Sequence, residues 1–397
     1  MTARARPVAA LATVALLAAV ALAHAQGSEL PAAEACRAVS LIDTASGRAL
    51  RGAEDIAIDA PSGVALISVD DRWAVEDAID AGAAVLPQGG IYALRLDPQS
   101  LSGDEFAAEN LTADFSRGRD FHPHGLALFN NGGQRVLFVV NHHRTQHEGA
   151  ETAAWRRRPA VEVFALEDGA LAHVRTVEHA AICRPNGIAA LGPERFLVTN
   201  DHGGCGALAA RLEDLLPLSR SNLVHVDFGA GSQGSESVRV VAGGFRFANG
   251  VALGTEEPPR IYVADTRRKA VFVYRLSDLL SQADAAPVQE LALESGPDNL
   301  EWLGGEHLLT GTHPRLLRLG LYLKRWFGVK SGPSRVIAID PASGRVQRLF
   351  DDPDGALISG ASTAAAYGRW LLIGSAAGAG LVICHLPIET GPPESNL

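Results

Sequence analysis

The stretch RPNGIAALGPERFLVTNDH (residues 184–202) contains the two patterns that decide the fold. The first pattern is a polar residue, then a small or polar residue, then a branched apolar residue, here Asn186-Gly187-Ile188. The second pattern follows within about 15 residues and is an apolar run that ends in polar residues, here RFLVTNDH (195–202). Short runs of this composition are typical of buried β-strands.

Both patterns recur along the chain. Other copies of the first are Glu54-Asp55-Ile56, His124-Gly125-Leu126, Asn249-Gly250-Val251, Asp298-Asn299-Leu300 and, more weakly, Ser362-Thr363-Ala364. Their first positions are separated by 70, 62, 63, 49 and 64 residues. Other copies of the second are VALISVDD (64–71), RVLFVVNHH (135–143), RIYVADT (260–266), HLLTGTH (307–313) and WLLIGSA (370–376). Further strand-type runs follow, such as IYALRLD (91–97), VEVFALE (161–167), AVFVYRL (270–276) and RVIAIDP (335–341).

Six units of short strands at a nearly constant period predict an all-β fold, a six-bladed β-propeller. The first pattern would begin the inner strand of each blade and place its polar residue at one mouth of the central channel. A two-domain β-sandwich protein is the alternative, but it does not predict six matching units.

Composition limits the class of protein. The chain has 397 residues, of which 47% are hydrophobic and 20% charged, and these values exclude a disordered protein. The formal net charge of -10 argues against a nucleic-acid partner, which needs a basic face. Length alone allows two or three domains, but the six repeats predict one domain over residues 26–397.

The N-terminus has the features of a secretory signal peptide. Arg4 and Arg6 precede an apolar run over residues 7–22, and Ala23-His24-Ala25 is a small-x-small cleavage site. We therefore expect residues 1–25 to be removed and the protein to be exported, to the periplasm or outside the cell. A membrane anchor is the alternative, although the apolar run is short for a span. No later stretch has the length and apolarity of a transmembrane helix.

The four cysteines are compatible with export. Pairing by sequence neighbourhood joins Cys36 to Cys384, near the two ends, and Cys183 to Cys205, in the middle. Two free thiols remain the alternative for Cys183 and Cys205.

The polar positions that the propeller would gather form a chemical set. It contains Glu54, His124, Asn186, Asn249, Asp298 and Asn299. Carboxylate and amide oxygens suit Ca²⁺, which takes six to eight oxygen ligands. Zn²⁺ prefers histidine or cysteine, and only His124 in this set offers such a ligand.

The ordered motifs of the chain resemble those of the serum paraoxonase/arylesterase family. The matching segments are GAEDI (52–56), FHPHGLALF (121–129), VVNH (139–142), RPNGIAALGPERF (184–196), TNDH (199–202), SVRVVAGGFRFANG (237–250), PDNLEW (297–302), GTHP (311–314) and LLIG (371–374). The resemblance extends over nearly all of residues 26–397 and includes the family's terminal disulfide, at Cys36 and Cys384.

The resemblance implies a calcium-dependent hydrolase of lactones and aryl esters. The implied ligands of the catalytic calcium are Glu54, Asn186, Asn249, Asp298 and Asn299. A histidine pair, His124 and His142, would lie above the ion, and Asp201, His202 and His313 would line or support the site. The calcium would polarise the substrate carbonyl, His124 would act as general base on water, and His142 would relay the proton or tune His124. In the alternative, Glu54 or Asp298 activates the water.

A second, structural calcium of the family is less well matched here. Asp55 and the backbone of Leu126 occupy family positions, but Gly187 replaces an acidic residue. This ion is therefore expected to be weakly bound or absent.

Two segments are expected to cover the channel mouth as short lid helices. Residues 205–222 have leucines at helical spacing, and Trp73 is a candidate pocket wall. Residues 315–332 alternate basic and bulky apolar side chains, so they would roof the site or contact a membrane surface, unless they simply connect two strands. The competing functions are a sugar lactonase of the gluconolactonase type and a non-catalytic propeller that binds a ligand at its mouth.

Overall fold

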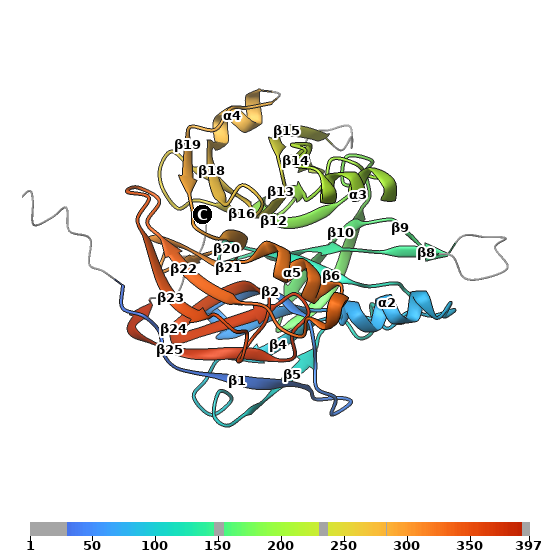
Figure 1. Ribbon diagram of the computed structural model, residues 1–397, viewed down its shortest axis with the longest axis vertical. Coiled ribbons are helices and arrows are strands. Elements are labelled where there is room, and N and C mark those ends of the chain that lie inside the picture. The colour runs from blue at the N-terminus through green and yellow to red at the C-terminus, as the bar shows by residue number, and fades with distance from the viewer. Residues whose placement is uncertain (1–29, 147–154, 230–236, 283, 391–397) are drawn as a thin grey trace, which may run out of the picture. The chain divides into compact units, whose positions relative to one another are not determined.

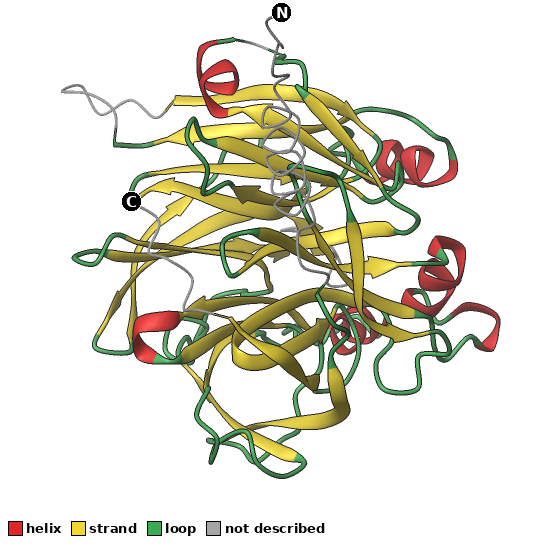
Figure 2. Ribbon diagram, turned by 90° about the vertical axis from the view of Figure 1, so that its left-hand side faces the viewer, coloured by secondary structure: helices red, strands yellow, loops and turns green. Residues whose placement is uncertain are grey.

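The computed structural model describes residues 30–146, 155–229, 237–282 and 284–390. Backbone contacts divide the chain into a short N-terminal unit, residues 1–31, and a second unit, residues 32–397. The leader expected over residues 1–25 lies outside the described residues. Within the second unit, strands far outnumber the few short helices (Figure 2).

Four of the blades are separate four-stranded antiparallel sheets among the described residues. Blade two contains β6 (Pro123–Asn130), β7 (Arg135–Asn141), β10 (Ala160–Glu167) and β11 (Ala170–Val177). Blade three contains β12 (Pro185–Gly192), β13 (Arg195–Asn200), β14 (Ser221–Asp227) and β15 (Ser237–Phe245). Blade four contains β16 (Ala248–Leu253), β17 (Arg260–Asp265), β18 (Ala270–Arg275) and β19 (Gln289–Ala292). Blade five contains β20 (Gly296–Leu303), β21 (His307–His313), β22 (Ser334–Ile339) and β23 (Val346–Asp352).

The first and last blades share one seven-stranded sheet, which closes the ring. Blade one contains β2 (Ala53–Asp59), β3 (Val64–Val69), β4 (Gly90–Arg95) and β5 (Glu105–Asn110). Blade six contains β24 (Ala361–Ser375) and β25 (Leu381–Thr390), and its next strand is the N-terminal β1 (Glu34–Asp43). β1 pairs antiparallel with β25 and parallel with β5, while the end of β5 pairs with β4. The all-β six-bladed propeller predicted from the repeats is therefore confirmed.

The six polar motifs all lie on the innermost strands, as the repeat pattern predicted. β2, β6, β12, β16, β20 and β24 contact one another in this order, and β24 contacts β2. In β2, β6, β12, β16 and β20 the pairing with the second strand slips by one residue at the motif, which is a β-bulge. A bulge bends the strand and re-aims the side chains beside it.

The apolar third residue of each motif fastens its blade to the preceding one. Ile56 packs with residues of blade six, and Leu126 with residues of blade one. Ile188, Val251 and Leu300 enter the next three interblade clusters in the same way. These side chains are at most 5% exposed. Each motif therefore contributes one polar residue to the axis and one apolar residue to an interblade core, so a register slip would disrupt both.

The larger insertions all leave the propeller after a second strand. They are α2 (Arg72–Asp80) in blade one, the hairpin β8 (Arg144–Gln146) and β9 (Trp155–Arg157) in blade two, α3 (Ala207–Leu215) in blade three and α5 (Leu316–Leu323) in blade five. Because each second strand runs antiparallel to an inner strand, it ends at the level where the polar motifs begin. The insertions accordingly lie on the same side in Figure 1, with α2, α5 and the β8–β9 hairpin toward the right.

The remaining short helices are α4 (Leu276–Ser281), η1 (Ala60–Ser62) and η2 (Trp326–Gly328). Within the described part of the chain, no helix is long and apolar enough to cross a membrane.

Two disulfides join the four cysteines. Cys36 on β1 is bonded to Cys384 on β25, so the two terminal strands are linked covalently as well as by their backbone pairing. Cys183 is bonded to Cys205, which ties the start of blade three to the loop before α3. The terminal pairing implied by the family resemblance is confirmed.

We predict that the terminal disulfide stabilises the fold more than the internal one. The bonds span sequence separations of 348 and 22 residues. By chain entropy, loops of these sizes correspond to about 5.8 and about 3.4 kcal/mol. The paired Cys36→Ser/Cys384→Ser variant should therefore lose about 2 kcal/mol more unfolding free energy in urea than Cys183→Ser/Cys205→Ser. Equal losses in the two variants would contradict this ranking.

Candidate metal and catalytic site

The axial polar side chains are deeply buried. Glu54, His124, Asn186, Asn249, Asp298 and Asn299 are between 3% and 6% exposed. Contacts connect them across blades: Asn299 Nδ2 lies 3.2 Å from Glu54 Oε1, and His124 Nδ1 lies 3.3 Å from Glu54 Oε2. The inner strands therefore bring residues more than 200 positions apart in the sequence into one cluster.

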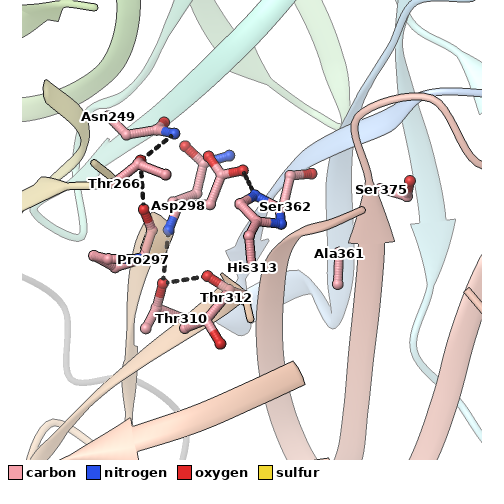
Figure 3. Close-up of polar contacts among 12 residues, drawn as sticks. Asn249, Thr266, Pro297, Asp298, Thr310, Thr312, His313, Ala361, Ser362 and Ser375 are labelled. Atoms are coloured by element: carbon pink, nitrogen blue, oxygen red, sulfur yellow. Dashed lines mark hydrogen bonds and ion pairs between the residues drawn. The ribbon is translucent and has the colours of Figure 1, made fainter. Parts of the chain in front are cut away.

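Hydrogen bonds fix the orientation of two of the amide side chains. Asn249 Nδ2 donates to Thr266 Oγ1 at 3.1 Å, and that hydroxyl donates to the backbone oxygen of Pro297 at 2.6 Å (Figure 3). Asn299 Nδ2 faces the backbone oxygen and Oε1 of Glu54, each at 3.2 Å. With both NH₂ groups engaged in this way, the amide oxygens are left to serve as acceptors or ligands.

Several oxygens of the cluster are buried without a hydrogen-bond donor. Among the described residues these include Glu54 Oε2, Asn186 Oδ1 and Asn249 Oδ1. Burying an oxygen without a partner is unfavourable, so such atoms are typical of a site that receives a cation. The described part of the chain contains no group of three or more His, Cys, Asp or Glu side chains placed to hold a metal. Amide oxygens make up much of this set, and Ca²⁺ accepts them readily.

The charge state of Glu54 also favours a cation. Burial raises the pKa of this carboxyl well above its usual range, and the negative charges of Asp55 and Asp298 raise it further. A cation between Glu54 and Asp298 would reverse this shift, because it favours the ionised carboxylates. The residues therefore fit a hard divalent cation.

His313 positions Asp298. Its Nε2 donates to Asp298 Oδ2 at 2.6 Å, and both side chains are buried (Figure 3). The backbone nitrogen of Asp298 also faces Thr310 Oγ1 at 3.3 Å. These contacts fix the carboxylate from the side chain and from the backbone.

His124 and His142 form a close pair. Their ring centroids are 4.4 Å apart and the rings are tilted by 34°. Burial lowers the pKa of His124 well below its usual range, with the charges of His142 and Arg72 acting in the same direction. Burial and the charge of Arg157 lower the pKa of His142 to about 3. Both imidazoles are therefore neutral near pH 7.

The neighbours of the pair determine which ring nitrogens carry protons. His142 Nε2 lies 2.8 Å from the backbone oxygen of Pro185, which only accepts, so Nε2 carries the proton and Nδ1 is free. His124 Nδ1 lies 3.2 Å from a guanidinium nitrogen of Arg72, which only donates. In this geometry the free basic nitrogen of the pair is Nδ1 of His142.

His202 and Asp201 connect the site to the lid helix α3. His202 Nδ1 lies 2.5 Å from Asp201 Oδ1, and Nε2 lies 3.1 Å from Asp214 Oδ1 at the end of α3. Although burial opposes protonation, the two carboxylates raise the pKa of His202 to about 9. Glu213 of α3 accepts from the backbone nitrogens of Gly203 and Gly204. The helix expected within 205–222 is therefore fastened beside Asp201.

The positions expected for a second calcium are used differently. The two oxygens of Asp55 accept from the backbone nitrogens of Ile56 and Leu126, at 3.0 and 2.8 Å, and from Thr363 Oγ1 at 3.1 Å. Asp55 thereby connects blades one, two and six. A Cβ placed on Gly187 would lie 2.6 Å from the backbone oxygen of Asn249, so a carboxylate cannot replace this glycine without moving the backbone.

Trp73 and the segment 315–332 meet at the mouth. The Trp73 indole nitrogen donates to the backbone oxygen of Leu323 at 2.9 Å, and its ring packs edge-on against Tyr322 of α5. Arg325 pairs with Asp77 of α2 through both nitrogens. α5 is thus docked on α2, while Leu317, Trp326 and Phe327 remain 78%, 59% and 89% exposed.

Two kinds of charged residue near the axial site were not predicted from the sequence. Arg72, Arg144, Arg157 and Arg184 come from four different segments, and their charges influence one another or the histidine pair. Glu301 lies on β20, and burial followed by the charge of Asp55 raises its pKa well above the usual range. The available sequence signal was the arginine run 156–158. Its middle residue, Arg157, pairs with Arg144, which lies two residues after His142 in the chain.

His122 is the centre of a buried ion network. Its Nδ1 lies 3.0 Å from Asp70 Oδ1 and its Nε2 lies 3.2 Å from Asp120 Oδ1. Although burial opposes protonation, the two carboxylates raise the pKa of His122 to about 9. Asp120 also accepts from the backbone nitrogen of Arg144, so the network connects α2, β6 and the β8–β9 hairpin.

Comparison with known proteins places these motifs in one family. A sequence model of the family described as Arylesterase matches residues 38–386. Serum paraoxonase/arylesterase 1 of Rattus norvegicus is 28% identical over 330 residues, which cover 82% of this chain and 83% of that protein. Serum paraoxonase/arylesterase 2 of Bos taurus and serum paraoxonase/lactonase 3 of Mus musculus are each 29% identical, over 341 and 336 residues, with the same coverage of both chains.

We predict that the stabilisation from His122 depends on pH. Because the folded-state pKa of about 9 lies above the usual 6.5, the contribution is complete below pH 6.5 and is lost as the pH rises through 9. The difference in unfolding free energy between the wild type and His122→Gln should shrink by about 3 kcal/mol from pH 6 to pH 10, measured in urea. A constant difference across this range would show that His122 is neutral in the folded protein.

Proposed function

The chain belongs to the arylesterase family, and we propose that it hydrolyses aryl esters and lactones with a calcium ion held at the axial site. The family is one of ester and lactone hydrolases, as the names of the relatives state. The proposed calcium ligands are Glu54, Asn186, Asn249, Asp298 and Asn299. The observation that best supports this proposal is the set of buried oxygens without donors, which includes atoms of three of these residues, Glu54, Asn186 and Asn249.

The calcium ion and the two histidines would have different roles in the reaction. When bound, the calcium supplies a Lewis acid for the carbonyl oxygen of the substrate. His124 lies against Glu54 and is therefore beside the ligand set. While its Nδ1 accepts from Arg72, the neutral ring carries its proton on Nε2, so His124 could act as general base on water only if Nδ1 gave up this contact. The free Nδ1 of His142 offers the pair a second acceptor, so His142 can relay the proton or take it in place of His124.

The supporting residues hold these groups in place. His313 fixes the carboxylate of Asp298, and Asp201 with His202 fastens α3 beside the pair. Trp73 joins α2 to α5 at the mouth and so forms part of the wall of the opening through which the substrate would enter. The hydrogen bond between Leu126 and Asp55 joins blades two and one, and the proposed site holds a single calcium ion.

We further propose that the protein is exported. Both disulfides are compatible with an oxidising compartment, and the expected signal peptide ends near Ala25. The exposed Leu317, Trp326 and Phe327, next to basic residues of 315–332, support a peripheral contact of this segment with a membrane surface.

We predict that activity depends on calcium and on the axial ligands. Hydrolysis of phenyl acetate and of an aliphatic lactone should disappear after EDTA treatment and return with Ca²⁺. Asn249→Ala and Asp298→Ala should lower kcat/KM at least about 100-fold, since each removes an oxygen from the site that stabilises the transition state. Asn131→Ala, in an exposed turn, is the matched control and should keep full activity.

The substrate pair also separates the competing functions. Hydrolysis of sugar lactones without turnover of phenyl acetate would favour a gluconolactonase-type enzyme, and ligand binding without any turnover would favour a non-catalytic propeller. Activity that survives complete removal of calcium would contradict the proposed role of the ion.

We predict that calcium also stabilises the fold. A cation that neutralises Glu54 and Asp298 binds the folded state only, so Ca²⁺ should raise the melting temperature, and the rise should grow with the logarithm of its free concentration above the Kd. Asn249→Ala should reduce this shift, whereas Asn131→Ala should preserve it. Differential scanning fluorimetry with and without Ca²⁺ measures the effect without any substrate.

A further inference from the structure

Four arginines surround the histidine pair at the mouth of the site. Arg72 begins α2, Arg144 and Arg157 lie on the β8–β9 hairpin, and Arg184 directly precedes β12. His142, Arg157, Arg184 and Asp201 line one small pocket. The charges of Arg72 and Arg157 both lower the pKa of His142, which shows that they act at the position of the pair.

Two of these arginines face each other across the hairpin. Arg144 and Arg157 are direct cross-strand partners in the β8–β9 pairing. Like charges in this arrangement repel and destabilise a strand pair. Desolvation and the charges of the neighbouring Arg144 and Arg184 together lower the pKa of Arg157 to about 10, although part of this side chain remains exposed to solvent. The hairpin therefore concentrates positive charge beside the histidine pair.

The protein supplies little of that opposing charge. Among the described residues, none of the four guanidiniums has a carboxylate within 4 Å, and Nε of Arg144 and Nε of Arg184 are buried without a hydrogen-bond partner. The nearest acidic groups are engaged elsewhere. Asp70 and Asp120 both contact His122, Asp201 contacts His202, and Glu76 lies near Lys324 at 3.6 Å.

The backbone that carries Arg184 is held in place. The backbone nitrogens of Cys183 and Arg184 both donate to Asn200 Oδ1, at 3.1 and 2.9 Å. Cys183 is also bonded to Cys205. Arg184 thus extends from a held backbone, and a guanidinium whose Nε has no partner is suited to binding a planar carboxylate through two parallel hydrogen bonds.

We propose that the ester or lactone substrate carries a carboxylate near its scissile bond, and that Arg157 and Arg184 bind this carboxylate, with Arg144 reinforcing the field. This inference rests on the proposed hydrolase function and specifies its substrate class. Because the two arginines would hold the carboxylate equally in the ground state and the transition state, they act as specificity-determining residues and affect mainly KM.

Paired substrates with and without a carboxylate test the proposal. 4-Acetoxybenzoate and its methyl ester place the charge on the leaving group, and monophenyl glutarate and its methyl ester place it on the acyl side. Arg157→Gln and Arg184→Gln should each lower kcat/KM about 10- to 100-fold for the charged member of at least one pair, mostly through KM. The neutral members should lose less than the charged members, so the charged-to-neutral ratio of kcat/KM should fall in both variants.

Arg158→Gln is the matched control, because this residue is in the same arginine run but is paired with Glu178 at 2.8 and 3.1 Å. It should leave the charged-to-neutral ratio unchanged. The ratio in the wild type should also fall as salt is raised. Equal loss for charged and neutral substrates in Arg157→Gln and Arg184→Gln, or no loss for either, would overturn the proposal.

A binding measurement keeps this test separate from the proposed hydrolase function. If the wild type hydrolyses none of the four substrates, the hydrolase proposal fails, but calorimetric titration of glutarate still examines the anion site. Glutarate should bind the wild type and Arg158→Gln, and binding should be lost in the double variant Arg157→Gln/Arg184→Gln. Binding that persists in the double variant, or is absent from the wild type, would overturn the assignment of these arginines.

Discussion

The close approach of neighbouring inner strands is the constraint on which the site depends. A Cβ placed on Gly125 would lie 2.2 Å from the backbone oxygen of Asn186, and one on Gly187 would lie 2.6 Å from that of Asn249. Each of these glycines follows an axial polar residue directly in the chain. Because glycine has no side chain, the backbones of adjacent motifs can touch. The polar residues of successive blades therefore lie close enough to form one cluster.

The same repeat explains how much the sequence alone could predict. The period and the apolar third positions located every inner strand, because Ile56, Ile188 and Leu300 occupy equivalent places in interblade cores. Five of the expected second strands match separate strands, as in 307–313, which is β21, whereas the sixth, 370–376, continues the inner strand β24. The seven-stranded seam was not predictable from the repeat, because β1 belongs to blade six in space but precedes blade one in the chain.

Charged residues outside the repeat were harder to find. A run such as Arg156-Arg157-Arg158 is typical of a solvated surface, and Arg158 does pair with Glu178 in this ordinary way. The position of Arg157 opposite Arg144 depends on a hairpin whose register no local pattern indicates. No motif marks the charged state of His122, because one of its carboxylates, Asp70, comes from another segment. His202 was expected near the site from the family resemblance, but its contact with Asp214 of α3 has no sequence signal. Electrostatic partners set by tertiary structure, and not by sequence spacing, therefore limit prediction here.

The seam between the first and last blades has a consequence for aggregation. β1 hydrogen-bonds to β25 on one side and to β5 on the other, so it covers two strand edges at once. Were β1 to detach, those two edges would be exposed as templates on which another chain could add a strand. In this architecture a single strand, placed before blade one in the chain, therefore covers two edges that could otherwise pair with a strand of another molecule.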